Sequence, residues 1–460
     1  MQVRVRAVKR VNPKFSGDMI NIIRKPAEIQ RAYDEITAGN KKGGCIVIRN
    51  ALVESAGVLK ELGIPVMATP RGGALRRMAI FRRERYDGPV ICVTGTAGKT
   101  SVRGMIYEIA KSQFKTVQNR GNWNFRDHVF ENIASMPIDT KCAVLEIGLG
   151  QKNVRLSDVV SVLKPSISVV TSIGVGHMDA IGSTSEVEDE LESAFKAKME
   201  VVDHMADDSF AVVASDITMS KEVISILKNK VSSYKTVGGQ PLDSVKMLER
   251  EWKDGKNRLL VESNGTQYRY DLAAPGEHMA KNSLIAICVA EKLGISMEKT
   301  LANLKKFTPR PGRAKLIDLE SRSGKKVVIF DDSRNSTPLS LASSLVTFEE
   351  IAKDKNKVAI LGEVGEFHVG KDMEGFHRNL AKEIKEKEFK RVLVMGDSMK
   401  YFVDEYNDAS YFETFEDLCK EFIGGIDDDC HVLIKASAHM KFQTLAAMIV
   451  ENPEFKHLNS

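Results

Sequence analysis

Short apolar runs alternate with amphipathic stretches along most of this chain. Runs of four to eight apolar residues separated by amphipathic helices are typical of buried parallel strands joined by crossover helices. The pattern therefore predicts a parallel sheet flanked by helices in the middle of the chain. The predicted strands cover 89–94, 142–148, 166–173 and 210–216, and the predicted helices between them include 99–112, 185–204 and 278–293.

The alternation stops and then restarts around residue 310. Pro309, Pro311 and Gly312 punctuate the chain there and indicate a domain boundary. Beyond it, four apolar runs each lead into a helical pattern, which predicts a second, doubly wound sheet. These runs are KVVIFDD at 326–332, KVAILGE at 357–363, RVLVMGD at 391–397 and HVLIKAS at 431–437. Just before the boundary, residues 258–272 look more β-like, and Asn264-Gly265 within them predicts a hairpin turn.

The first part of the chain predicts a smaller α/β module. Residues 43–50 (GGCIVIRN) and 64–70 (IPVMATP) are candidate strands, and residues 56–62 are a candidate short helix. A chain of 460 residues suggests about three domains. We therefore expect an α/β protein with three domains, at 1–86, 87–312 and 313–460.

Composition agrees with an ordinary globular enzyme. Apolar residues make up 43% of the chain and charged residues 28%. No run approaches the roughly 20 apolar residues of a membrane span, and the charged start does not resemble a signal peptide. We therefore expect a cytoplasmic protein with no membrane partner. The six cysteines show no CxxC pairing, which argues against a zinc site or a disulfide framework.

Charge is distributed unevenly along the chain. Residues 1–86 hold 18 Lys and Arg but 7 Asp and Glu, whereas the remaining chain is net acidic. A basic module on an acidic body suggests an anionic group as its partner, and a solvated basic surface is an equally good interpretation. Nothing else in the sequence indicates a nucleic-acid partner.

The strongest chemical signal follows the first central strand. The sequence Gly95-Thr96-Ala97-Gly98-Lys99-Thr100-Ser101 lies between a buried strand and a helix start. Glycines let backbone N–H groups approach phosphates, and a helix N-terminus favours negative charge. Lys99 would reach the β- and γ-phosphates and Thr100 would bind Mg²⁺. The usual P-loop has a further glycine where Val93 stands, so this loop is a variant.

Two polar residues follow neighbouring strands. Glu146 ends CAVLEIG, and His177 follows SISVVTSIGVG. Ligands bind at the carboxyl ends of parallel strands, and a carboxylate and an imidazole there could hold a divalent cation. Either residue alone would more often be structural, but beside a phosphate-binding loop they predict a metal site.

These motifs together resemble the Mur ligase superfamily, whose members join an amine to a carboxylate with ATP. The resemblance covers about residues 88–450 and implies a central P-loop ATPase domain and a C-terminal Rossmann-like domain. The segment SIGVGHMDAIGS is most similar to the subgroup that adds D-alanyl-D-alanine to a UDP-muramoyl tripeptide. Residues 1–85 show no match to the donor-binding module of that subgroup.

The resemblance implies ATP and two Mg²⁺ sites, with Mn²⁺ as a possible substitute. Glu146 and His177 would lie at the second metal, together with Lys198 if that lysine is carbamylated; Lys196 is a less suitable alternative. Asn282 would contact adenine, although Met279 replaces a usual Asn, and His278 could simply cap the helix. The catalytic residues implied are Lys99, His177, Lys198 and Arg313.

The C-terminal blocks extend this set. In RPGR the resemblance implies that Arg313 reaches the nucleotide phosphates, and in DDSRNSTP that Asp332 meets the ribose, while Arg334 could add a phosphate contact. Residues implied to face the two substrates are Asn122, Asn124, Asn335, Glu363 and Glu366. The two glutamates could instead be plain surface residues. Ala436 and Ala438 replace the Gly and Arg of the subgroup, so a different amine specificity is expected.

The resemblance implies that a carboxylate attacks the γ-phosphate of ATP and that an amine then displaces phosphate from the acyl phosphate. Two enzyme hypotheses remain open: a peptidoglycan-precursor ligase with a diverged UDP-binding domain, or a ligase for another carboxylate and amine. A third hypothesis is a non-catalytic nucleotide-binding relative that acts as a regulator or scaffold, and the metal-site residues argue against it. Folylpolyglutamate-type ligases share the core but match the DDSRNSTP block less well.

Overall fold

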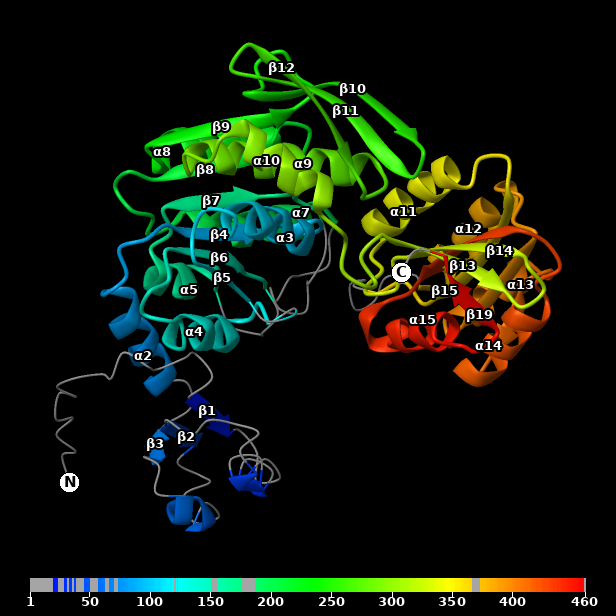
Figure 1. The fold of residues 1–460 in the computed structure, drawn as a ribbon, viewed down its shortest axis with the longest axis horizontal. Coiled ribbons are helices and arrows are strands. Elements are labelled where there is room, and N and C mark those ends of the chain that lie inside the picture. The colour runs from blue at the N-terminus through cyan, green and yellow to red at the C-terminus, as the bar shows by residue number, and fades with distance from the viewer. Residues whose placement is uncertain are drawn as a thin grey trace.

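The computed structural model contains three sheets in chain order (Figure 1). The first is a small parallel sheet in the order β1-β2-β3, made of Ile20–Ile23, Cys45–Arg49 and Val66–Thr69. The predicted strands at 43–50 and 64–70 are therefore confirmed. The expected helix at 56–62 is instead a 3-10 helix, η2 (Gly57–Leu62). The structure describes residues 20–23, 29–30, 33–34, 37–38, 45–49, 57–62, 66–69, 73–119, 121, 123–149, 155–174, 187–365 and 373–458.

The central sheet has nine strands in the order β12-β11-β10-β9-β8-β7-β4-β6-β5. The strands from β9 to β5 are parallel, as the alternating pattern predicted, and β10 continues parallel to β9. β11 and β12 then extend the sheet in antiparallel fashion. Their bounds are β4 Val90–Thr94, β5 Thr116–Gln118, β6 Cys142–Glu146, β7 Ile167–Val170, β8 Phe210–Ala214, β9 Ser233–Gly238, β10 Val245–Lys253, β11 Lys256–Ser263 and β12 Thr266–Leu272.

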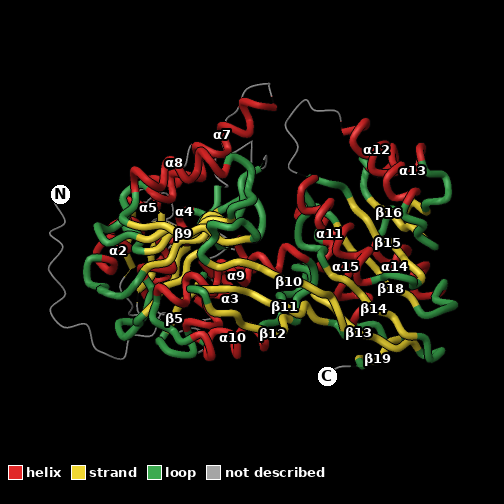
Figure 2. The backbone as a smooth tube through the Cα atoms, turned by 90° about the horizontal axis from the view of Figure 1, so that it is seen from above, coloured by secondary structure: helices red, strands yellow, loops and turns green. Residues whose placement is uncertain are grey.

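Helices cover both faces of this sheet (Figure 2). Successive strand residues point to opposite faces, so Ile91 and Val93 pack with α3 and α9, whereas Val90 and Cys92 pack with α4 and α5. The helices are α3 Lys99–Ala110, α4 Arg126–Ala134, α5 Leu156–Leu163, α7 Val187–Met199, α8 Ser220–Lys230, α9 Glu277–Lys292 and α10 Met297–Lys306, and a 3-10 turn, η3 Glu200–Val202, extends α7.

The C-terminal sheet has seven strands in the order β17-β16-β15-β18-β14-β13-β19. Five of them are parallel, and β13 and β19 continue the sheet in antiparallel fashion. The strands are β13 Lys315–Ser321, β14 Lys326–Asp331, β15 Asn356–Gly362, β16 Arg391–Met395, β17 Ser410–Phe412, β18 Cys430–Lys435 and β19 Phe455–His457.

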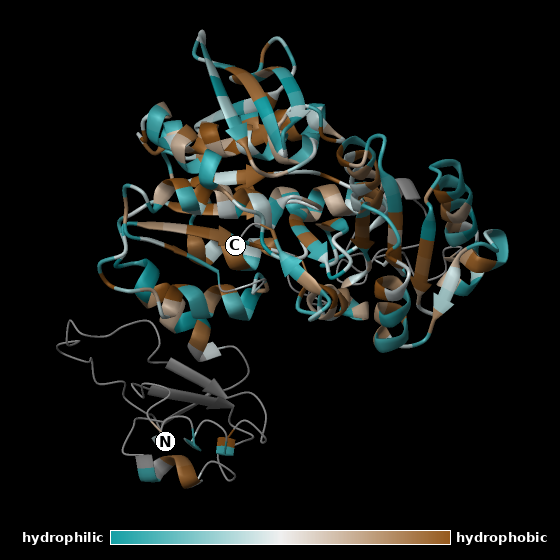
Figure 3. Ribbon diagram, turned by 45° about the vertical axis from the view of Figure 1, so that its right-hand side comes forward, coloured by the Kyte–Doolittle hydropathy of each residue, from teal (hydrophilic) through white to brown (hydrophobic). Residues whose placement is uncertain are grey.

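Its helices are α11 Pro338–Ile351, α12 Met373–Glu386, α13 Met399–Glu405, α14 Phe415–Gly424 and α15 Phe442–Val450, with a 3-10 turn, η4, at Ala438–Met440. Hydrophobic residues concentrate on the strands of both large sheets (Figure 3). Fold class and the four predicted C-terminal strands are confirmed. The domain limits at 86 and 312 stay a prediction.

Two arginines attach helix α2 (Gly73–Arg83) to the central domain. Arg82 donates to the carbonyls of Met136 and Pro137 at 2.9 and 2.6 Å. Arg83 donates to the carbonyls of Leu163 and Lys164, at the C-terminus of α5, at 2.5 and 2.9 Å. Cations at a helix C-terminus satisfy carbonyls that have no partner within the helix. Part of the basic charge counted in residues 1–86 is therefore used in docking this helix.

Candidate active site

The loop between β4 and α3 has the conformation of a phosphate cradle. Gly95 and Gly98 have φ angles of 146° and 80°, which favour glycine. A Cβ at Gly95 would lie 2.1 Å from the Thr171 hydroxyl, so this position has no room for a side chain. Thr171 and Ser172, which follow β7, bond the loop backbone at Ala97 at 2.5 and 2.8 Å. Neighbouring strand ends thus fix the loop, and α3 begins at Lys99 with its N-terminus facing it.

Lys99 and Thr100 lie at this helix start. The Lys99 ammonium donates to the carbonyls of Gly95 and Thr96 at 2.6 and 3.2 Å, so its charge lies over the loop. The Thr100 hydroxyl donates to Glu146 Oε2 at 2.9 Å. The structure therefore brings the predicted P-loop threonine and the predicted strand-end carboxylate into direct contact.

Glu146 is buried at the end of β6 and is held on several sides. Asn124 donates to its Oε1 at 2.7 Å, and Asn119 bonds its backbone N–H and carbonyl at 2.6 and 3.0 Å. Burial raises the pKa of the Glu146 carboxyl, but the charges of Arg103 and Lys99 outweigh it and lower the pKa overall. Glu146 is consequently ionised and oriented. Asn119 was not anticipated, and only its place just before the Asn122–Asn124 segment hinted at it.

Arg103 is a second residue that the sequence reasoning missed. It lies one turn after Lys99 on α3, is fully buried, and places Nη1 3.6 Å from Glu146 Oε2. The same nitrogen donates to the Gly121 carbonyl at 3.0 Å, whereas Nε and Nη2 are buried without hydrogen bonds. Burial lowers the Arg103 pKa to about 10, and the Glu146 charge opposes that decrease. An arginine four residues after a P-loop lysine shares its helical face, and this spacing was the available signal.

Asn282, predicted to contact adenine, lies against the phosphate loop. A Cβ on Gly98 would meet its Oδ1 at 3.0 Å. Its amide contacts the Met279 sulfur at 3.8 Å, at the position where the resemblance implied another Asn. His278 does not cap α9, because its Nδ1 bonds Ser343 of α11 at 3.2 Å instead.

A pocket of about 280 Å³ opens beside α3. Arg313 lines it from the hinge, the segment 307–314 between α10 and β13. Arg310 of the same segment also lines it and donates to Gln118 Oε1 at 3.3 Å. Thr100 and Ser101 line the opposite side. The pocket therefore joins the phosphate loop to the hinge arginines. Its further lining residues are Gly104, Glu108, Gln118, Lys306, Phe307 and Thr308.

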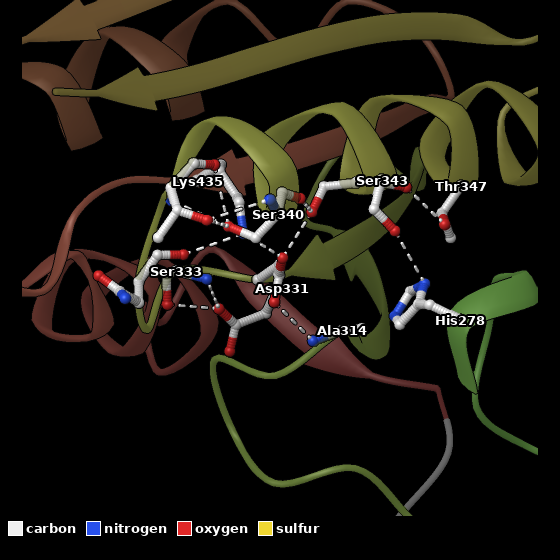
Figure 4. Close-up of polar contacts among 12 residues, drawn as sticks. His278, Ala314, Asp331, Ser333, Ser340, Ser343, Thr347 and Lys435 are labelled. Carbon is white, nitrogen blue, oxygen red and sulfur yellow. Dashed lines mark hydrogen bonds and ion pairs between the residues drawn. The ribbon is translucent and has the colours of Figure 1, made fainter. Parts of the chain in front are cut away.

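The two aspartates at the end of β14 have different surroundings, and Figure 4 labels the first of them, Asp331. Asp331 is buried and accepts the Gly312 N–H at 2.7 Å, which fixes the hinge. Burial raises the pKa of Asp331 despite its hydrogen bonds with Ser333. Asp332, predicted to meet a ribose, accepts from Ser344 at 2.6 Å and forms an ion pair with Lys435 at the end of β18.

Arg334 lies on the same side of the hinge as Arg313. Its backbone N–H donates to the Gly312 carbonyl at 3.0 Å, and its Nη1 donates to Gln443 at 2.9 Å. Burial lowers the pKa of Arg334, and the charge of Arg313 lowers it further. Arg313 and Arg334 thus concentrate positive charge around this segment, which fits a site that binds anionic phosphates.

The remaining predicted residues divide into those described and those not. Lys198 is buried near the end of α7, whereas Lys196 is exposed and pairs with Glu192 at 2.6 Å. Glu363 and Asn335 lie together at strand ends of the C-terminal sheet, as detailed below. Asn122, His177 and Glu366 lie outside the described residues.

The donor set suits a hard cation. Thr100 and Glu146 supply adjacent oxygens, and oxygen ligands are those that Mg²⁺ prefers. Within the described ranges no group of three or more His, Cys, Asp or Glu gathers as a ready metal site. Among the helices described, none is both long and apolar enough to cross a membrane.

Comparison with known proteins gives one family. Residues 93–290 match the Mur ligase middle domain. The UDP-N-acetylmuramoyl-tripeptide–D-alanyl-D-alanine ligase of Rickettsia prowazekii is 24% identical over 417 residues, covering 90% of this chain and 88% of the relative. The enzyme of the same name from Bacillus subtilis is 25% identical, covering 83% and 80%.

Solved structures agree on the fold. The crystal structure of MurF from Acinetobacter baumannii superposes with a TM-score of 0.76 at 19% identity, covering 94% of this chain and 93% of that one. MurF from Thermotoga maritima in complex with ADP gives a TM-score of 0.73 at 18% identity, covering 96% of both chains. The overall fold of these structures is thus shared over nearly the whole chain.

Proposed function

We propose that this chain, whose residues 93–290 match the Mur ligase middle domain, is an ATP-dependent amide ligase of that family that joins the carboxylate of a peptide-bearing acyl donor to an amino acid or dipeptide. The observation that carries this proposal is the contact of Thr100 with Glu146, beside the pocket that Arg313 lines. A phosphate loop, a metal-binding carboxylate and a phosphate-binding arginine then converge at one edge of the sheet.

ATP would bind between the P-loop and the hinge. The backbone of residues 95–98 and the N-terminus of α3 would hold its phosphates, with Lys99 leaving the Gly95 carbonyl to reach them. Arg313 and Arg334 would approach from the hinge, Ser101 would add a hydroxyl, and Asn282 would contact the adenine. Asp332 would meet the ribose only after loosening its ion pair with Lys435.

Two Mg²⁺ ions would lie around Thr100 and Glu146, with His177 and a carbamylated Lys198 as further ligands; Mn²⁺ would also suit these oxygens. Bound there, the ions would neutralise charge on the transferred phosphoryl group. The protein's own part is to hold Glu146 ionised, which Arg103 and Lys99 do.

The chemical step would begin when the donor carboxylate attacks the γ-phosphate of ATP, so that the bond to the bridging oxygen breaks, ADP leaves and an acyl phosphate forms. Lys99 and Arg313 would stabilise the charge on the transferred group, and Asn122 and Asn124 would position the donor. Asn124 already bonds Glu146, so donor and metal sites adjoin. Movement of the C-terminal domain over the nucleotide would complete the site.

The amine would bind at the C-terminal strand ends. Glu363 and Glu366 would attract its ammonium group, and Asn335 would add a hydrogen bond. Burial raises the pKa of Glu363, yet its bonds with Ser398 and His439 lower it overall, which keeps the carboxylate charged. Ala436 and Ala438 replace the Gly and Arg of the D-alanyl-D-alanine subgroup, so its amine need not be D-alanyl-D-alanine.

The named relatives act on UDP-N-acetylmuramoyl tripeptide and D-alanyl-D-alanine, and these are the first substrates to test. The basic residues of the N-terminal module would contact an anionic group of the donor. The same proposal places the enzyme in the cytoplasm, where ATP is available.

Phosphate release from ATP and Mg²⁺ tests the proposal. Carboxylate donors, including UDP-N-acetylmuramoyl tripeptide, are crossed with amino acids and dipeptides, and mass spectrometry identifies the product. Amine-dependent release with the muramoyl donor would assign a peptidoglycan precursor, and release with another pair would identify other substrates. Silence with ATP still bound would contradict the ligase and favour a regulator.

Lys99→Ala is the matched control for that assay. We expect turnover to fall below detection while the protein still folds, because Lys99 would contact the transferred phosphate and its hydrogen bonds described above go to carbonyls of its own loop. Circular dichroism establishes the fold, and phosphate release establishes the loss. Retained turnover would remove Lys99 from the mechanism.

A further inference from the structure

Three loops of the C-terminal domain meet at the carboxyl ends of β14, β15 and β18. Asn335 follows β14, and its Oδ1 accepts the Ala438 N–H at 3.1 Å. Glu363 follows β15, and its carbonyl accepts the Ser437 N–H at 2.8 Å. The Gly365 N–H donates to the Ser336 carbonyl at 2.9 Å. Ligands bind at such strand ends, and this is where the proposed function places the amine.

A chain of hydrogen bonds runs through this point. Ser437 Oγ lies 2.9 Å from His439 Nδ1, and His439 Nε2 lies 2.7 Å from Glu363 Oε2. The other oxygen of Glu363 accepts the Ser398 N–H at 2.9 Å. With Nε2–H donated to the carboxylate, Nδ1 is left to accept the serine proton. The linkage therefore aligns a hydroxyl, an imidazole and a carboxylate.

Solvent exposure differs strongly between the two ends of the Ser437–His439 hydrogen bond. The Ser437 residue is 2% exposed, whereas the His439 side chain is 64% exposed. Glu363 lies between these extremes at 15%. A proton received at the buried Ser437 could thus reach solvent through the exposed imidazole.

Two other charged or titratable groups that the structure describes nearby, Lys435 and His377, are already engaged. Lys435 pairs with Asp332 and donates to the Asn335 carbonyl at 2.9 Å. His377 of α12 accepts the Val364 N–H at Nε2 and bonds the Met373 carbonyl through Nδ1. These contacts already occupy both side chains, so the Ser437–His439–Glu363 linkage is the candidate for taking a proton from the amine.

We propose that Ser437, His439 and Glu363 form a relay that takes a proton from the incoming amine. This inference rests on the proposed function and assigns how the nucleophile is generated. An amine enters as its ammonium form and cannot attack until it loses a proton. Ser437 is the residue that takes the proton from the substrate nitrogen, His439 receives the serine proton, and Glu363, whose charge also attracts the ammonium group, holds His439 in place.

In the proposed step, proton transfer along the linkage precedes formation of the amide bond. One ammonium proton passes to Ser437 Oγ while the serine proton passes to His439 Nδ1, and Glu363 stabilises the resulting imidazolium. The freed nitrogen lone pair attacks the acyl carbon and the C–N bond forms. The C–O bond to phosphate breaks, its electron pair stays on phosphate, and phosphate takes the second nitrogen proton. The imidazolium returns its proton to water after the products leave.

A change of nucleophile tests this inference. The donor is UDP-N-acetylmuramoyl tripeptide, and the nucleophiles are D-alanyl-D-alanine and hydroxylamine, which is uncharged at neutral pH. We expect His439→Gln to lower kcat with the dipeptide roughly a hundredfold, the usual size of a general-base effect, without raising its KM. Hydroxamate formation should remain near the wild-type rate, because hydroxylamine needs no deprotonation.

The matched control is His457→Gln, an exposed histidine on the edge strand β19. It should leave both reactions unchanged. In His439→Ala, added imidazole should restore part of the dipeptide reaction, and Ser437→Ala should reproduce the selective loss. Equal losses with both nucleophiles would indicate a structural role and overturn the relay.

Failure of the proposed function gives a different result. In that case the wild type forms neither amide nor hydroxamate with any donor of the phosphate-release panel, so no acyl phosphate arises. If instead the wild type forms both products and His439→Gln matches it, the ligase assignment stands and the relay is wrong.

Discussion

At the scale of single residues, the buried pair of Arg103 and Glu146 organises the central site. The two side chains are essentially excluded from solvent and lie 3.6 Å apart. A buried charge is tolerated only when a partner and hydrogen bonds compensate its lost hydration. Glu146 has both, through Arg103, Thr100 and Asn124. The pair therefore keeps a carboxylate charged inside the protein.

Removing Arg103 should be costly. We expect Arg103→Met to lower the free energy of unfolding by about 3 kcal/mol, the usual penalty for leaving a buried charge alone. Urea denaturation at pH 7 measures it. The double variant Arg103→Met/Glu146→Gln is the control and should recover part of the loss, because its carboxamide carries no charge. A double variant no more stable than the single one would show that the charge is not the cause.

At the scale of elements, the start of α9 packs against α11. Gly276 has φ 86°, and a Cβ there would lie 2.4 Å from the Thr347 hydroxyl. His278 bonds Ser343 one turn earlier on α11 (Figure 4). Arg250 of β10 pairs with Glu350 at the far end of the same helix. The central and C-terminal sheets are thus joined along one face of α11.

This contact should weaken in acid. Burial lowers the His278 pKa from 6.5 to about 4. Between these values the unfolded chain binds more protons than the folded one, so stability falls as pH decreases through that window. We expect His278→Gln to show a smaller loss of unfolding free energy between pH 7 and pH 5 than the wild type. Urea titrations at both pH values measure this difference.

The exposed His457 again serves as the control, and His457→Gln should keep the wild-type acid dependence. An unchanged dependence in His278→Gln would mean that this histidine is not buried in its neutral form.

At the scale of the whole molecule, α2 belongs with the central domain by its contacts. Leu75 and Ala79 of this helix are buried in the same hydrophobic cluster as Val129 and Phe130 of α4. Arg82 and Arg83 add the carbonyl contacts described above. A cut at 86 would therefore remove part of the central core, although the sequence pattern places the boundary there.

Two truncations separate these views. Removing residues 1–72 should leave ATP binding intact and shift the melting temperature by at most a few degrees. Removing residues 1–86 should lower the melting temperature clearly further, because Leu75 and Ala79 leave the core. Differential scanning calorimetry with and without ATP compares them. Equal melting temperatures would show that α2 contributes little.

Much of the fold could be predicted from the sequence because its parallel strands are buried on both faces. β4, β6, β8 and β14 are continuous apolar runs, and the structure confirms each. β10, with the sequence VKMLEREWK, was not predicted, because five of its residues are charged and many of its side chains face solvent. β17 and β19 were missed because three residues are too short for a pattern.

The candidate site could be predicted where a residue type suited to binding phosphate or metal also stands at a strand end or a helix start. Lys99, Thr100 and Glu146 each stand at a strand end or helix start, and Thr100 and Glu146 do meet. Arg103 and Asn119 could not be found this way, because their roles depend on contacts between segments distant in sequence. His439 could not be predicted, because no motif surrounds it and its partner Glu363 is 76 residues away in the sequence.

The way in which α2 docks affects how freely the surface beneath it can change in sequence. Arg82 and Arg83 reach backbone carbonyls, which every residue possesses, rather than particular side chains. Substitutions at Met136, Leu163 or Lys164 would leave those acceptors in place. The surface that receives the helix can therefore change sequence during evolution without releasing the module attached to it. Because these contacts use the backbone, the central domain can keep the N-terminal module attached while the two sequences diverge at different rates.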